Sequence, residues 1–172
     1  RRVLFRSVLP YLQGLVKEGF TVTLISFEKP LAFNKHATGI KELCLQSGIN
    51  WEPMIYTKRP PVLSTLYDLF RLHRKVKQRI QIQPPAILHC RSYLTTLAVA
   101  GLAKKKRIKL LFDIRGFWID ERVEGRIWNI NNPIYRFIFK WLKKKEKRLF
   151  TESDSIVSLT SAAVPVIQQL QG

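Results

Sequence analysis

Short apolar segments alternate with longer stretches of helical periodicity along the chain, and this alternation constrains the fold more than any other feature. The segments with the β-branched and aromatic composition typical of strands are 21–27, 51–56, 86–90, 109–113 and 155–160. Helical spacing of apolar residues predicts helices over 8–17, 35–46, 63–82, 93–104, 133–150 and 162–170. Strands that alternate with helices form βαβ units. The pattern therefore predicts an α/β, Rossmann-like domain with a mostly parallel sheet flanked by helices.

Local signals set the expected ends of several elements. Lys29-Pro30 closes the first of these strands, Ser92 is expected to cap the helix that begins at residue 93, and Pro133 is expected to begin a helix. Residues 114–132 are polar and aromatic and include Gly116 and Gly125. This composition predicts a long functional loop that directly follows a buried strand.

The length of 172 residues fits one domain and hardly two. Residues 2–5 have the composition of a first strand, yet Ser7 leads into the first predicted helix with no loop between them. A doubly wound domain normally has an irregular turn at that point. We therefore expect residues 1–6 to be a truncated or foreign start, and the domain to span residues 7–172.

The charge of the chain is strongly positive, since 30 Lys and Arg residues against 12 Asp and Glu residues give a formal +18. Such a chain attracts nucleic acid, an anionic membrane surface or a phosphate-bearing ligand. Two cysteines, Cys44 and Cys90, are too few for a disulfide-rich secreted scaffold. No apolar run approaches the length of a membrane span of about 20 residues. We therefore expect a cytoplasmic protein with reduced cysteines.

Several common sites have no support in the sequence. The glycine-rich motifs of dinucleotide-binding and P-loop proteins and the nucleophile elbow of hydrolases do not occur. The three histidines (His36, His73 and His89) and the two cysteines do not follow zinc-ligand spacing. We therefore expect no metal and no resident cofactor.

The first candidate site lies where the strand at 86–90 gives way to a helix. His89 and Arg91 can carry positive charge, and the helix amino terminus attracts anions, so the segment could hold an anion or sugar hydroxyls. The alternative is that His89 is a satisfied, half-buried side chain and that Ser92 is only a cap.

The second candidate site directly follows the strand at 109–113. It comprises Asp113, Arg115, Gly116, Phe117, Trp118, Asp120, Glu121 and Arg122. Carboxylates accept hydrogen bonds from sugar hydroxyls, arginines hold phosphates, and aromatic faces stack on pyranose rings. The alternative is a surface loop whose acidic and basic side chains pair in water, which contributes little. The position of Asp113 favours a site, because α/β folds bind ligands at the carboxyl ends of strands.

The helix at 133–150 combines one apolar face with many basic residues. Its apolar residues at helical spacing are Ile134, Phe137, Ile138, Trp141, Leu142 and Leu149. Three interpretations stay open: a core-packed helix with a solvated basic face, a basic face drawn to anionic lipid, and a nucleic-acid surface. For the lipid interpretation the membrane-facing residues are Lys140, Lys143, Lys144 and Lys147. The basic run at 104–107 has the same ambiguity.

Taken together, these segments resemble the amino-terminal domain of family-4 glycosyltransferases. The segments that carry the resemblance, from residue 7 onward, are 9–12, 23–28, 89–93, 112–118, 120–122, 144–149 with Glu146, and 154–160. Many relatives have a histidine after the strand that ends here at Asp113, and this chain has the aspartate in its place.

The resemblance implies one half of a GT-B fold, in which two Rossmann-like domains face each other across a cleft. It also implies sugar transfer with retention of anomeric configuration, from a nucleotide-sugar donor and without an essential metal. Asp113 and Arg115 would contact the transferred sugar or the acceptor as catalytic residues, and Arg91 would support them. The carboxyl-terminal, donor-binding domain is expected to lie outside this chain, so the fragment alone is expected to be inactive.

We therefore expect the acceptor-side domain of a retaining glycosyltransferase that acts on bacterial surface glycans or lipid-linked precursors at the inner face of the membrane. The alternatives are a non-catalytic basic α/β module that binds nucleic acid and a GT-B sugar-nucleotide epimerase. The carboxylates of Asp113, Asp120 and Glu121 disfavour nucleic acid, because they repel a phosphodiester backbone.

Overall fold

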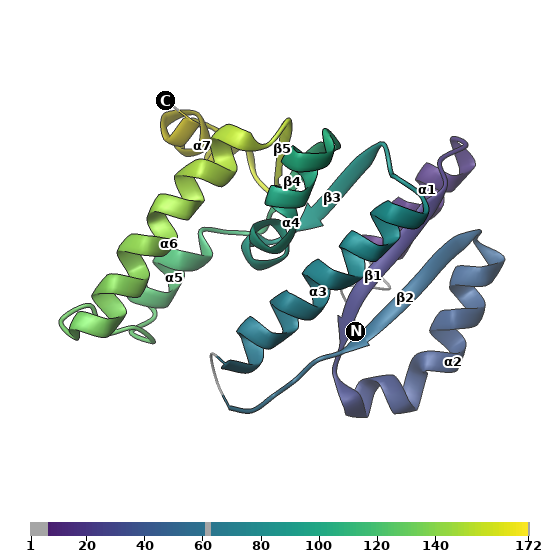
Figure 1. Ribbon diagram of the computed structural model, residues 1–172, viewed down its shortest axis with the longest axis horizontal. Helices are drawn as coiled ribbons and strands as arrows, with labels where there is room; N and C mark the ends of the chain where they lie inside the picture. The colour runs from purple at the N-terminus through teal and green to yellow at the C-terminus, as the bar shows by residue number, and fades with distance from the viewer. Residues whose placement is uncertain (1–6, 61–62, 172) are drawn as a thin grey trace. The chain divides into compact units, whose positions relative to one another are not determined.

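A computed structural model of the chain describes residues 7–60 and 63–171 (Figure 1). The strand predicted at residues 2–5 and the expected foreign start at 1–6 lie outside the described residues. The chain divides into two compact units, Arg1–Ser64 and Thr65–Gly172. Every described strand pair is parallel, which confirms the predicted α/β, Rossmann-like class. That residues 7–172 make one domain stays a prediction.

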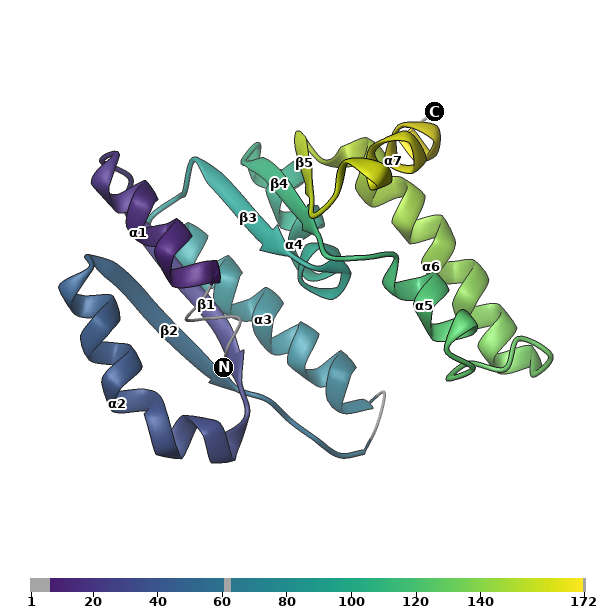
Figure 2. The same ribbon diagram turned by 180° about the vertical axis from the view of Figure 1, so that it is seen from behind.

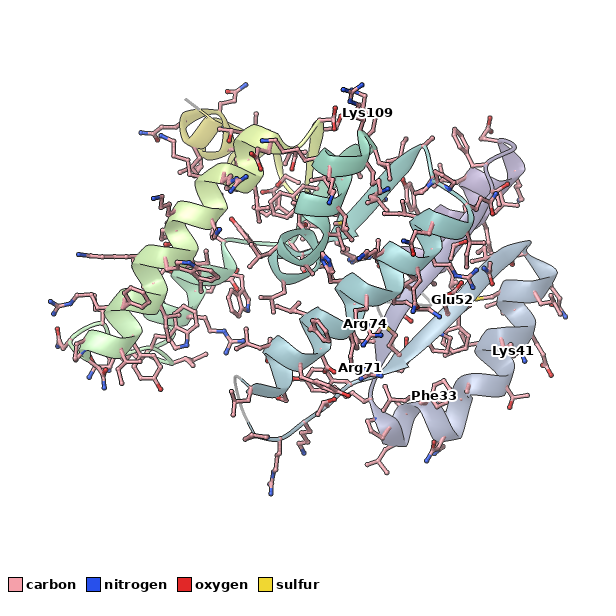
Figure 3. The ribbon with its side chains drawn as sticks, viewed as in Figure 1. Phe33, Lys41, Glu52, Arg71, Arg74 and Lys109 are labelled. Atoms are coloured by element: carbon pink, nitrogen blue, oxygen red, sulfur yellow. The ribbon has the colours of Figure 1, made fainter. Side chains whose placement is uncertain are left out.

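Within its described residues, the first unit has a two-stranded parallel sheet and two helices. Its elements are α1 (Leu9–Lys17), β1 (Val22–Glu28), α2 (Pro30–Gln46) and β2 (Ile49–Ile55). Its buried core comprises Leu9, Leu12, Ile40, Cys44 and Ile49. Helix α2 begins at Pro30, earlier than predicted, because the fixed φ of proline suits the first turn of a helix. Phe33 of this helix, labelled in Figure 3, lies 6.2 Å from the ring of Trp51 in β2.

The second unit contains a three-stranded parallel sheet in the order β3-β4-β5. Its elements are α3 (Leu63–Ile82, which begins just before the unit boundary), β3 (Ile87–Arg91), α4 (Tyr93–Lys106), β4 (Lys109–Ile114), α5 (Trp118–Glu124), α6 (Pro133–Glu152), β5 (Ser155–Ser158), the 3₁₀ turn η2 (Ser161–Ala163) and α7 (Val164–Gln171). Figures 1 and 2 show that α4 lies against β3 and β4, and that α6 lies alongside both α5 and α7.

Three aromatic rings join the helices of this unit to its sheet. Tyr93 of α4 meets the ring of Phe112 in β4 edge-on at 5.2 Å and the ring of Phe150 in α6 at 6.1 Å. Phe112 and Phe150 are fully buried. Because edge-to-face pairs add to the stabilisation from apolar burial, this cluster holds α4 and α6 on β4, the strand that ends at the candidate site.

The structure corrects the prediction about the segment after β4. Residues 114–132 are not a continuous loop, because they contain the short helix α5. Asp120 and Glu121 lie in its first turn, where the helix dipole favours negative charge, and Gly125 follows its last residue. A helix of seven residues is too short to show a clear apolar period in sequence.

The apolar face predicted for α6 is buried only in the carboxyl-terminal half of the helix. Leu149 and Phe150 are buried, but Ile134, Phe137 and Trp141 are exposed. Periodicity shows that a helix has an apolar face, but it does not show what covers that face. No helix among the described residues is long and apolar enough to cross a membrane.

Candidate functional site

The carboxyl ends of β3, β4 and β5 lie at one edge of the three-stranded sheet, because the strands are parallel. The register places Arg91 opposite Asp113, and Asp113 opposite Val157. Since side chains alternate along a strand, His89 and Arg91 share a face of the sheet with Asp113. The two predicted strand-end sites thus meet at this edge.

Asp113 is the centre of this polar cluster, with only 4 % of its surface exposed. Arg115 Nη2 donates a hydrogen bond to Asp113 Oδ2, and His89 Nε2 lies 3.5 Å from the same oxygen. The other carboxylate oxygen, Oδ1, is buried and has no hydrogen-bond partner among the described residues. Arg115 Nε is likewise buried and unpartnered within residues 7–60 and 63–171. The cluster therefore holds one unused acceptor and one unused donor.

Burial in the cluster holds the pKa of His89 below its usual value and so favours the neutral imidazole. Burial lowers the pKa of His89, and the nearby charges of Arg115 and Arg91 lower it further, whereas Asp113 opposes the shift. Burial also lowers the pKa of Arg91, helped by the charge of Arg115 and opposed by Asp113. A neutral imidazole can donate or accept a hydrogen bond at neutral pH.

The lowered pKa of His89 predicts an acid-dependent loss of stability. Unfolded His89 takes up a proton near pH 6.5, but in the folded protein it does so only at lower pH, so stability is complete above about pH 6.5 and falls as the pH drops toward the folded pKa. We expect His89→Gln to reduce the slope of the free energy of unfolding against pH, measured by urea unfolding between about pH 7 and pH 5. An unchanged slope would show that His89 does not contribute to it.

The turn between β3 and α4 differs from the predicted cap. The Ser92 side chain does not cap α4, and Ser92 has a φ of 91°, which is uncommon for a residue other than glycine. Its amide donates a hydrogen bond of 2.9 Å to the Asp113 carbonyl, and its carbonyl accepts from the hydroxyls of Thr95 and Thr96. These bonds tie the β3–α4 turn to the end of β4.

Gly116 allows the chain to turn from β4 into α5. Its φ is 145°, and a Cβ atom at this position would overlap the carboxylate of Glu121. No other residue type meets both conditions without strain. Gly116 therefore has a conformational role in the predicted site.

In the segment that follows β4, the aromatic ring of Trp118 is already in contact with other side chains. The guanidinium of Arg122 lies 4.9 Å from the ring centroid of Trp118, and Trp128 meets Trp118 edge-on at 5.6 Å. Phe117 is half-buried directly before α5. Stacking of a sugar on Trp118 or Phe117 stays a prediction.

A buried polar network beneath α5 was not predicted as part of the site. Glu146 of α6 is 1 % exposed, accepts a hydrogen bond from the Tyr93 hydroxyl and pairs with Lys143. Lys143 also bonds Asp120 Oδ2 of α5 at 2.9 Å. The network therefore links α4, α5 and α6. An acidic residue four positions after Leu142 and three before Leu149, on the buried stripe of a helix, is the sequence signal that indicates it.

These contacts affect the ionisation of two members. Burial lowers the pKa of Lys143, but its bonds to Glu146 and Asp120 outweigh this effect and the net pKa is raised. Burial and the bond to Glu146 both raise the pKa of Tyr93. Lys143 thus carries its charge toward this network, which conflicts with its predicted place on a membrane-facing surface.

The described residues contain no group of three His, Cys, Asp or Glu side chains that could hold a metal ion. Both cysteines are buried thiols, and burial raises the pKa of Cys90 to about 12. Such a thiol is a poor nucleophile at neutral pH. The groups present at the edge, the carboxylate of Asp113, the guanidinium of Arg115 and the imidazole of His89, can form hydrogen bonds and stabilise charge.

A protein-family model described as Glycosyltransferase Family 4 matches residues 5–172. The match includes both strand ends that form the cluster around Asp113 and the helices that support them. Comparisons with curated proteins and with solved structures gave no match.

Proposed function

Since the chain belongs to glycosyltransferase family 4, which is of the GT-B type, we propose that it is the acceptor-side domain of a retaining glycosyltransferase. The sugar would come from a nucleotide-sugar bound by a second, carboxyl-terminal domain. The acceptor would be a glycan or a lipid-linked precursor of a bacterial surface polysaccharide, at the inner face of the membrane. Family membership favours this function over a nucleic-acid-binding module or a GT-B epimerase.

One observation carries the proposal: the ion pair of buried Asp113 with half-buried Arg115 leaves the buried atoms Asp113 Oδ1 and Arg115 Nε without partners among the described residues. Buried polar groups are normally satisfied, so each unsatisfied group needs an explanation. Sugar hydroxyls both donate and accept, and can therefore satisfy both atoms. A phosphodiester has no proton to donate to Asp113 Oδ1, so it can satisfy Arg115 Nε but not the carboxylate oxygen.

The roles of the cluster follow from its contacts. Asp113 accepts a hydrogen bond from a hydroxyl of the acceptor or of the transferred sugar, and this bond fixes the orientation of that hydroxyl. Arg115 fixes the position of the Asp113 carboxylate. Its Nε–H donates a hydrogen bond to a hydroxyl oxygen of the sugar. Neutral His89 lies beside the same carboxylate. In the reaction the bond from the sugar C1 to the donor phosphate breaks, a bond from C1 to the acceptor oxygen forms on the same face, and the proton of the acceptor hydroxyl leaves with the nucleoside diphosphate.

The proposal predicts that the 172-residue chain alone gives no sugar transfer, whereas the enzyme that also contains the donor-binding domain does. The reason is that stabilisation of the departing nucleoside diphosphate belongs to the second domain. Release of nucleoside diphosphate, measured with a panel of nucleotide-sugars and sugar acceptors, checks both parts. Transfer by the isolated chain would contradict the domain assignment. A longer enzyme with no transfer to any sugar acceptor would contradict the function.

A further inference from the structure

Four large apolar side chains at the start of α6 are exposed to solvent. Ile130 lies in the loop before the helix and is 43 % exposed, while Ile134, Phe137 and Trp141 on the helix are 67 %, 70 % and 46 % exposed. The three helix residues follow i, i+3 and i+7 spacing, so they lie on one stripe. We call these four residues the α6 apolar stripe.

The loop is fixed to the first turn of α6 beside this stripe. Arg136 Nε donates a hydrogen bond of 3.1 Å to the Ile130 carbonyl, and Asn132 Oδ1 accepts one of 2.9 Å from the Ile134 amide. These two bonds therefore hold Ile130 and the first turn of α6 in a fixed arrangement. Single exposed apolar residues are common on protein surfaces, but a grouped set that includes two aromatic rings indicates an interaction site.

A basic stripe runs along the same helix next to the apolar one. It comprises Arg136, Lys140, Lys144 and Lys147, all exposed and at spacings of three or four residues. The acidic residues of α6 do not offset it there. Glu146 is buried against Tyr93 and Lys143, and Glu152 pairs with Lys104 and Arg148 at the far end of the helix.

We propose that the α6 apolar stripe and the adjacent basic stripe bind the surface of an anionic lipid bilayer. Trp and Phe side chains favour the boundary between headgroups and acyl chains, and lysines beside them attract anionic headgroups. Charge complementarity favours an anionic bilayer as the partner. The four cations match its negative headgroups, and the aromatic rings beside them match the apolar acyl chains beneath those headgroups. Lys143 is not part of this surface, because its ammonium contacts Asp120 and Glu146.

The position of the stripes gives the binding a consequence for the site. Helix α6 leads into β5 and lies beside α5, with which its middle is in contact through the bond from Lys143 to Asp120 (Figures 1 and 2). In βαβ units the helices run antiparallel to the strands, so the amino-terminal end of α6 lies toward the edge where Asp113 lies. The membrane would then present a lipid-linked acceptor to that edge, a consequence that rests on the proposed function.

Vesicle co-sedimentation of the 172-residue chain tests the proposal. We expect binding to vesicles that contain phosphatidylglycerol and little binding to pure phosphatidylcholine, with a decrease at high salt. The paired variants Phe137→Ser/Trp141→Ser and Lys140→Glu/Lys144→Glu should each lower the partition coefficient by about tenfold or more. All four residues are solvent-exposed or close to it, so folding, checked by circular dichroism, should be unchanged.

Matched controls separate the stripes from general stickiness and general charge. Phe20→Ser alters an exposed aromatic residue in the first unit, and Lys105→Glu/Lys106→Glu alters two exposed lysines at the end of α4. Both controls should change the partition coefficient by less than about twofold.

Three outcomes would overturn the proposal. These are equal binding to the two kinds of vesicle, unchanged binding by Phe137→Ser/Trp141→Ser, and a dimer in analytical ultracentrifugation that this variant abolishes, which would assign the stripe to a second copy. Because the readout is lipid binding and not sugar transfer, failure of the glycosyltransferase assignment would leave this result standing, and the reverse also holds.

Discussion

Replacing Asp113 with asparagine should lower sugar transfer by the enzyme that contains the donor-binding domain by about 10- to 100-fold. Asparagine keeps the shape of the side chain but removes the charge that Arg115 neutralises. It also puts an amide in place of one carboxylate oxygen, so that a hydroxyl held at Oδ1 loses a charged acceptor. Hydrogen bonds to charged groups contribute about 1.5–3 kcal/mol, and each 1.4 kcal/mol is tenfold in rate.

The matched control for this variant is Asp154→Asn. Asp154 is an exposed carboxylate bonded at 2.6 Å to the Nζ atom of Lys109, which is labelled in Figure 3. Lys109 begins β4, whereas Asp113 lies near the other end of this strand. We expect this control to keep its transfer rate within about twofold. A wild-type rate in Asp113→Asn, with circular dichroism unchanged, would remove Asp113 from the site.

Replacing Glu146 with alanine should destabilise the folded chain by about 3–5 kcal/mol. The change leaves the buried Tyr93 hydroxyl without its acceptor and leaves Lys143 with Asp120 as its remaining carboxylate partner. It also leaves a cavity in a fully buried position. Urea unfolding followed by circular dichroism measures the loss.

Two further variants separate the polar network from simple loss of volume. Tyr93→Phe removes only the hydroxyl and should cost about 1–2 kcal/mol, and its effect should largely disappear in a Glu146→Ala background. Glu124→Ala, at an exposed position in α5, should change stability by less than about 0.5 kcal/mol. A loss below about 1 kcal/mol in Glu146→Ala would show that the network contributes little to stability.

Much of the fold could be predicted from the sequence, because each strand is a short β-branched or apolar run and each longer helix has a clear period. The predicted bounds of α3 match the structure, and the parallel pairing follows from strands that alternate with helices. Local pattern could not reveal α5, which is too short to show a period. Local pattern also predicts the start of α2 too late, because the same signal at Pro30 indicates either the end of a strand or the beginning of a helix.

The position of the candidate site could also be predicted, since His89, Arg91 and Asp113 follow apolar runs whose carboxyl ends meet at one edge of the sheet. The sequence could not show which carboxylate oxygen is used, because that depends on the rotamers of Asp113 and Arg115. Nor could it separate Lys143 from Lys140 and Lys144. The three lysines are equivalent in composition, and only packing turns Lys143 toward Glu146.

The central claim is that Asp113 and Arg115 hold sugar hydroxyls, and the Nε–H resonance of Arg115 tests it most directly. The chain labelled with ¹⁵N-arginine is titrated with glucose, mannose, galactose and N-acetylglucosamine, and separately with inorganic phosphate, and Arg115→Lys assigns the signal. The Nε–H resonance should shift with at least one sugar and stay in place with phosphate, and the sugar-induced shift should disappear in Asp113→Asn. A shift with phosphate alone, or no shift with any sugar, would contradict the claim.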